Sequence, residues 1–168
     1  MSGVNRDEPE LLQLSTLVLW LGAAVFFSVA VAPALFAVLP SRALAGDVVG
    51  RLLPPIFYSG MVVGLLVMVT QWRANEGWSW RGREIAALVT ILSCAVAQLF
   101  IAPRIDRARA EIPGPIEVLS TDDPRRVAFG RLHGESVAWL GIAMLAALVA
   151  AVIAARAARS SRRDIHTL

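Results

Sequence analysis

The sequence predicts an all-α membrane protein in which four transmembrane helices form one bundle. Four segments contain no charged residue: 11–41, 52–72, 85–103 and 136–155. An α-helix needs about 20 apolar residues to cross a hydrocarbon core about 30 Å thick, and each segment has about that length. A charge at the centre of a span costs about 2.5–3.5 kcal/mol, so uncharged segments of this length indicate four spans. The composition agrees, because 57% of the residues are hydrophobic and the mean hydropathy is +0.63.

The lengths of these segments leave room for one domain. We expect a polar N-terminal tail over residues 1–10, a single transmembrane domain over 11–155 and a basic C-terminal tail over 156–168. The first apolar segment follows acidic residues and is longer than the apolar core of a signal peptide. We therefore interpret it as a retained membrane anchor.

Two features are expected around the first connection. Pro33 lies near the end of the first span, where its missing N–H should loosen or kink the helix. Apolar residues then recur at helical spacing between the first and second spans. This pattern predicts a short interfacial helix over residues 42–55 that ends at Pro54-Pro55.

Small residues predict the packing faces of the second and fourth spans. Gly60 and Gly64 form a GxxxG spacing, which lets another helix backbone approach closely. Ala143, Ala147 and Ala151 recur every four residues and so share one helical face. These faces suit packing within one chain or against a second copy, and we favour packing within the chain.

The one long connection, residues 104–135, is predicted to be partly helical. Its first part can continue the third helix beyond the membrane until the Pro-Gly-Pro sequence at 113–115 ends it. Asp123 and Pro124 have the residue types preferred at the N-cap and at the first position of a helix. We expect that helix to continue into the fourth span.

The distribution of arginines predicts orientation and partners. All 16 basic residues are arginines near the ends of the apolar segments, which indicates contact with membrane lipid and not with nucleic acid. An even number of spans places both termini on one side. The stretch 156–163 has four arginines and no acid, so we expect cytoplasmic termini, in a bacterial inner membrane.

The chain path gathers polar residues at the membrane face opposite the termini. They are the candidate binding residues of a polar vestibule: Arg42, Asp47, Arg51, Arg104, His133 and Glu135. A histidine beside arginine and carboxylates can titrate near neutral pH, which would suit proton coupling or pH sensing. A simpler interpretation of His133 is a hydrogen bond to a lipid headgroup or to a helix end.

We expect no catalytic residue, no metal and no cofactor. The sequence has no CxxC, HExxH, GxSxG or phosphate-binding loop. One of its two histidines, His166, lies in the C-terminal tail, so a pair of haem ligands is not expected. Cys94 is the one cysteine and excludes an intrachain disulfide.

Two classes of function follow from these observations. The first is a non-enzymatic membrane protein that binds or helps to move a small molecule or ion through the vestibule. The alternative is a structural or assembly protein whose small-residue faces pack against partner helices, including those of a second copy.

Several short motifs follow one another along the four spans: Leu19-Trp20-Leu21-Gly22, Leu39-Pro40, Arg51-Leu52-Leu53-Pro54, Ala102-Pro103-Arg104 and Leu132-His133-Gly134. In this order they resemble the transmembrane protein 205-like family, whose bacterial members are catalogued as a domain of unknown function. The resemblance extends over residues 14–147 and implies a four-helix integral membrane protein. The animal member is associated with resistance to platinum drugs. By position, the resemblance implies that Pro54, Pro103, Arg104 and His133 are the residues to test first.

Overall fold

The computed structural model describes residues 7–74 and 82–166, and all regular structure within these ranges is helical. The first span comprises α1 (Asp7–Phe26), the π-helix η1 (Phe27–Val31) and α2 (Ala32–Val38). The second span is α3 (Arg42–Ala74). The third span comprises α4 (Gly82–Ala95), the π-helix η2 (Val96–Ile101) and α5 (Ala102–Ala110). A 3-10 helix, η3 (Ile116–Val118), precedes α6 (Pro124–His166), which contains the fourth span.

The predicted fold class is confirmed. Four helical segments are long and apolar enough to cross a membrane: Glu10–Val38, Arg42–Trp72, Gly82–Ala110 and Pro124–Arg159. With 43 residues, α6 is about 64 Å long, so it extends well beyond a 30 Å hydrocarbon core. Its last turns include residues 156–166, which belong to the predicted basic C-terminal tail.

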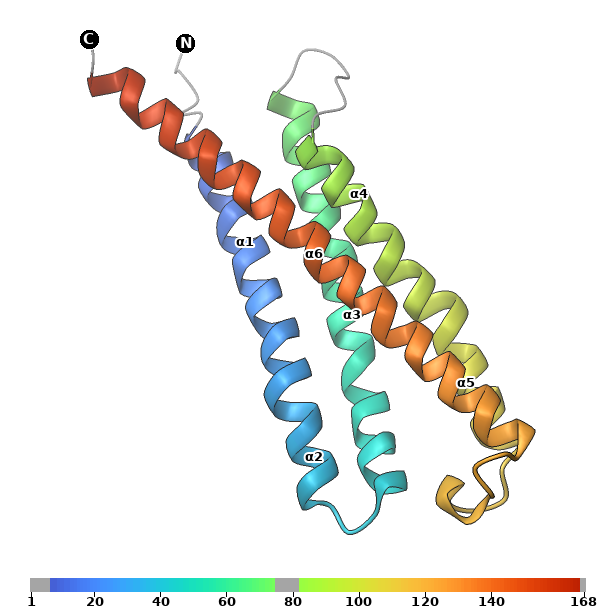
Figure 1. Cartoon of the computed structure of the whole chain (residues 1–168). Coiled ribbons are helices and arrows are strands. Elements are labelled where there is room, and N and C mark those ends of the chain that lie inside the picture. The colour runs from blue at the N-terminus through green and yellow to red at the C-terminus, as the bar shows by residue number, and fades with distance from the viewer. Residues whose placement is uncertain (1–6, 75–81, 167–168) are drawn as a thin grey trace.

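The four spans form a ring. Each of α1 and α4 packs against both α3 and α6. The start of α1 and the end of α6 lie at one end of the bundle, here called the terminus end (Figure 1). The opposite end, here called the loop end, holds the turn between α2 and α3 together with α5, η3 and the start of α6.

The first and third spans each contain a π-helical segment. The backbone N–H of Ala32 donates to Phe27 O, and that of Ala102 donates to Ala97 O. Both bonds close a turn that is one residue wider than an α-turn, and a proline follows each of them. The ring of a proline clashes with the carbonyl four residues earlier, and a widened turn relieves this clash. The predicted loosening at Pro33 is thus confirmed.

The predicted interfacial helix over residues 42–55 is wrong as a separate element. Residues 42–74 form one continuous helix, with Pro54 and Pro55 inside it. The two prolines leave the carbonyls of Gly50 and Arg51 without their helical donors. Both of these residues are exposed near the loop end, where water can bind their carbonyls, so the helix continues.

The core of the bundle is mainly apolar and tightly packed. Trp20 is buried and its indole Nε1 donates to Ile56 O at 3.0 Å, which pins the ring between α1 and α3. A Cβ added to Gly60 would lie 2.7 Å from both Cys94 Sγ and Trp20 Cζ2, so only a glycine fits there. Gly64, Ala143, Ala147 and Ala151 are buried as well. The small-residue faces therefore pack inside the chain.

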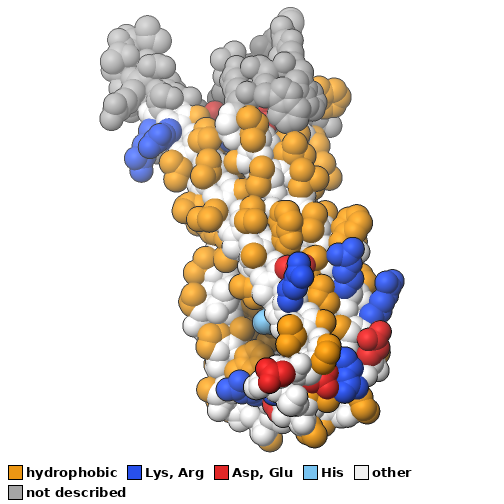
Figure 2. All heavy atoms as spheres, turned by 45° about the vertical axis from the view of Figure 1, so that its right-hand side comes forward, with side chains coloured by type: hydrophobic (Ala, Val, Ile, Leu, Met, Phe, Trp, Pro, Cys, Tyr) orange, Lys and Arg blue, Asp and Glu red, His pale blue; other side chains and the backbone are white. Residues whose placement is uncertain are grey.

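The outer surface suits lipid contact over most of its height. Figure 2 shows hydrophobic side chains covering the middle and upper bundle, with most of the described arginine, aspartate and glutamate side chains on the lower part and further basic side-chain atoms near the upper end. Large apolar side chains such as Leu19, Val29 and Leu145 are more than half exposed. Exposed apolar side chains are the expected surface of a membrane span.

Candidate functional site

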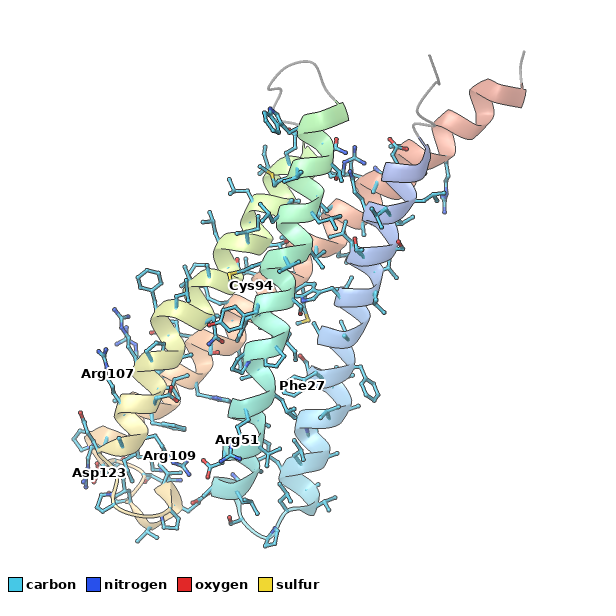
Figure 3. All side chains as sticks on the ribbon, turned by 180° about the vertical axis from the view of Figure 1, so that it is seen from behind. Phe27, Arg51, Cys94, Arg107, Arg109 and Asp123 are labelled. Carbon is cyan, nitrogen blue, oxygen red and sulfur yellow. The ribbon has the colours of Figure 1, made fainter. Side chains whose placement is uncertain are left out.

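The six predicted vestibule residues all lie at the loop end. Three are on the first turns of α3, Arg104 is on α5, and the other two are on the first turns of α6. Glu135 is half-buried and the other five are exposed. Figure 3 shows Arg51 of this set at the loop end, together with Arg107, Arg109 and Asp123.

The six residues form an open polar edge of the bundle, here called the rim. Asp47 pairs with Arg109 of α5 at 3.1 Å, and Glu135 pairs with Arg131 of its own helix at 3.1 Å. His133 stacks on Phe129 with ring centroids 6.5 Å apart. Among the described residues, no hydrogen bond or ion pair joins two members of the predicted set. The set shares an end of the molecule without converging on one point.

Arg109 is a rim residue that our sequence reasoning missed. It links α5 to α3 through Asp47, and both side chains remain partly exposed, at 28% and 55%. Exposed pairs of this kind contribute about 0–1 kcal/mol. The sequence shows only that Arg109 is a basic residue near the end of the third helix, and this does not identify Asp47 as its partner.

The connection before α6 is held by local hydrogen bonds. The backbone N–H of Arg125 donates to Asp123 Oδ1 at 2.9 Å, which confirms Asp123 as the N-cap and Pro124 as the first helical residue. The Arg125 side chain also donates to this carboxylate, and these bonds lower the pKa of Asp123 to about 2. Arg126 Nη1 donates to Leu119 O at 2.7 Å. The start of α6 is therefore anchored to the preceding loop.

Gln98 is a deeper polar group, and it lies in η2. Its Oε1 atom is buried and accepts no hydrogen bond. Near the other end of these helices, a Cβ on Gly82 would lie 3.2 Å from Ile153 Cδ1. Gly82 and Ile153 therefore lie at the same level, and the two helices run antiparallel. Gln98 follows Gly82 by the same number of residues by which Val137 precedes Ile153, so Gln98 lies level with Val137 and the buried Ser136. Packing of η2 on α6 agrees with this register.

Ser136 connects this deeper level to the rim. His133 and Ser136 are three residues apart on α6, so they lie on neighbouring turns of one helical face. Ser136 is 6% exposed, whereas His133 is exposed. On the third span, Arg104 follows η2 by three residues. The loop end thus has polar side chains at its edge and again at the level of the π-helix.

A second polar cluster lies at the terminus end. Gln13 Nε2 donates to Thr70 Oγ1 at 2.6 Å, and Gln71 Nε2 donates to Gln13 Oε1 at 3.1 Å. Gln13 is fully buried and Gln71 is 4% exposed. These bonds join α1 to α3 inside the bundle. This cluster is not among the sites predicted from the sequence.

Comparison with known proteins identifies a family for this chain. The model of a family described as a domain of unknown function (DUF4149) matches residues 15–113. No curated protein and no solved structure matches the chain. The matched region is more than half of the chain and contains most of the first span, the second and third spans, and both π-helical segments. The chain belongs to the DUF4149 family.

Proposed function

We propose that this protein is a non-enzymatic integral membrane protein that binds a small polar molecule or ion within the loop end of its bundle. The binding group is Gln98, and the rim residues Arg104 and His133 line the way to it. Binding at this depth would allow the protein to help move the bound species across the membrane.

The observation that carries the proposal is the buried Oε1 atom of Gln98. A buried acceptor without a partner costs about 1–3 kcal/mol, and a donor supplied by a ligand removes that cost. Gln98 also lies in a π-helical segment, and such segments occur frequently at functional sites. Irregular backbone at membrane depth is expected where it lines a cavity or is covered by protein.

The packing of the small residues favours this function over the assembly role. Gly60, Gly64, Ala143 and Ala147 face other helices of the same chain, so they are not available to a partner helix. Small-residue faces that remained open to lipid would have favoured assembly.

The cellular setting is part of the same proposal. Arg156 and Arg159 at the terminus end suit contact with anionic headgroups, which supports cytoplasmic termini in a bacterial inner membrane. Similarity to transmembrane protein 205-like proteins is also proposed, and it rests on the order of the short motifs along the spans.

Native mass spectrometry of the full chain, released from mild detergent, tests the function. We expect a discrete non-lipid mass on the wild-type protein that Gln98→Met loses. Leu99→Met is the matched control, because Leu99 is the next residue and is 53% exposed toward lipid. It should keep the mass.

A different outcome would contradict the binding function. If wild type and both variants carry only lipid, and Gln98→Met unfolds at a higher temperature than wild type, the amide is an unsatisfied group of the core. The binding function would then be wrong.

A further inference from the structure

We infer that the chain consists of two matched helical hairpins, and that Ser28 of the first hairpin is the counterpart of Gln98 in one shared binding site. The first hairpin is α1–η1–α2 with α3, and the second is α4–η2–α5 with α6. The inference rests on the proposed function and extends it by a second binding residue and by the chemistry of the ligand.

The first evidence for a repeat is the form of the broken spans. In both hairpins, an α-helix passes into a π-helical segment, then into a short α-helix that begins with Ala-Pro. Each π-segment ends on the same bond, from the alanine N–H to the carbonyl five residues earlier. Two independent interruptions of this form are unlikely to coincide in position and sequence.

The second evidence is the pattern of buried residues. The shift that superposes Pro33 on Pro103 places every buried position of the first span on a buried position of the third: Gln13 on Arg83, Leu17 on Ala87, Trp20 on Thr90, Ala24 on Cys94, and Phe27 on Ala97. The third span has further buried positions, and one of them, Ser93, falls on the exposed Ala23. The shift that superposes Gly60 on Ala143 pairs buried positions over residues 57–71 of the second span: Phe57 with Leu140, Gly64 with Ala147, Val67 with Ala150, and Gln71 with Ala154. Nearer the loop end the match ends, because buried Ala45 falls on exposed Ala128.

The third evidence is the packing of the ring. The contact of α1 with α3 corresponds to that of α4 with α6, and the contact of α3 with α4 corresponds to that of α6 with α1. Exchanging the two hairpins therefore reproduces the arrangement. The approximate two-fold axis runs along the spans, which is the symmetry of transporters built from parallel repeats, whose sites lie between the repeats near the membrane midplane.

The repeat pairs Ser28 with Gln98. Each residue lies five positions before the proline of its span, and each is the one polar residue of its π-segment, FSVAV in η1 and VAQLFI in η2. Two apolar segments that each carry a single polar residue at the matched position indicate a shared role.

The hydrogen bonds define the kind of ligand. Ser28 Oγ donates to Ala24 O at 2.8 Å, so its hydrogen is engaged and its oxygen remains an acceptor. Gln98 Oε1 is likewise an acceptor. A ligand held by both residues therefore presents hydrogen-bond donors, as an ammonium group, a hydroxyl compound or a hydrated cation does.

The two hairpins differ in how their π-helical segments pack. The segment η2 packs against both α3 and α6, whereas η1 packs chiefly against α1 and α2, which continue it. Figure 1 shows α2 and the start of α6 diverging toward the loop end. The π-helical segment of the first hairpin therefore has fewer neighbouring helices than that of the second.

Cysteine accessibility tests the inference on the full chain in proteoliposomes. Cys94 is first replaced by alanine, the residue at its matched position, Ala24. Ser28→Cys and Gln98→Cys are then labelled by a membrane-impermeant quaternary-ammonium methanethiosulfonate reagent applied to both faces. The controls are Val29→Cys and Leu99→Cys, because these matched neighbours are 70% and 53% exposed toward lipid.

Both site cysteines should react at least about tenfold faster than their lipid-facing neighbours, because only a hydrated thiol forms the reactive thiolate. Fast labelling at residue 98 with slow labelling at residue 28 would overturn the inference about Ser28 and leave the proposed function standing. Slow labelling at residue 98 would overturn the proposed function as well. Size-exclusion profiles that match the Cys94→Ala parent ensure that slow labelling is not a folding defect.

Discussion

At the residue scale, the atoms around a glycine decide whether a larger side chain fits there, and its position in an apolar span does not. Gly22 and Gly60 both lie inside apolar spans, yet a Cβ on Gly22 meets no atom within 4 Å. A Cβ on Gly60 meets Trp20, whose ring cannot withdraw without losing its bond to Ile56 O. The GxxxG spacing therefore marks a real close approach of helices at Gly60.

Gly60→Ala should destabilise the protein by about 1–3 kcal/mol through overpacking against Trp20 and Cys94. Thermal unfolding in mild detergent measures the effect as a lower Tm. Gly22→Ala is the control and should leave the Tm unchanged or slightly raised, because alanine favours the helix. Equal Tm values for wild type and Gly60→Ala would contradict this account of the contact.

At the scale of the element, the start of α6 depends on one carboxylate. Asp123 receives the Arg125 backbone and side-chain N–H groups, and its pKa is lowered to about 2 from an ordinary value of 3.8. A lowered folded-state pKa means that the stabilisation is present above about pH 4 and is lost as the pH falls toward 2. The Asp123 cap should therefore stabilise the start of α6 fully at neutral pH.

Hydrogen exchange in the first turns of α6, compared between variants at each pH, checks this cap. Asp123→Ala should increase exchange at pH 7, because the Arg125 N–H loses its acceptor. Asp123→Asn keeps a side-chain oxygen and should protect the same amides at pH 7, without the loss of protection between pH 4 and pH 2. Identical pH profiles for Asp123→Asn and wild type would show that the carboxylate charge has no role.

At the scale of the whole molecule, the two ends of the bundle are held together differently. At the terminus end, buried Gln13 of α1 is hydrogen-bonded to both Thr70 and Gln71 of α3, while the loop end has the exposed Asp47–Arg109 pair between α3 and α5. Buried interhelical hydrogen bonds contribute about 0.6–2 kcal/mol, and exposed ion pairs about 0–1 kcal/mol. The terminus end should therefore be the more strongly coupled.

Double-mutant cycles compare the two ends. Gln13→Leu with Gln71→Leu should show a coupling free energy of about 0.6–2 kcal/mol in denaturant unfolding in micelles. The matched cycle of Asp47→Ala with Arg109→Ala should give a smaller value that declines with added salt. A larger coupling at the loop end would reverse this view of the bundle.

The sequence by itself determined the four spans, the break at Pro33, the extension of the third helix and the cap at Asp123. Each of these follows from local chemistry: apolar length, a missing N–H or a side chain beside its own backbone. The predicted helix end at Pro54-Pro55 was wrong. The rule that proline ends a helix considers only the local chain, whereas exposed carbonyls at the bundle end can bind water in place of the missing helical N–H.

Only the tertiary structure decided which polar residues meet. It placed all six rim residues at the loop end, as their chain positions required, but paired Asp47 with Arg109 and left no bond between members of the set. The bonds of Gln13 to Thr70 and Gln71 and the match between the two hairpins likewise depend on which helix faces lie inward. Hydropathy cannot reveal this in a membrane, because the lipid-facing and core-facing sides of a span are equally apolar, so helix packing alone selects the contacts.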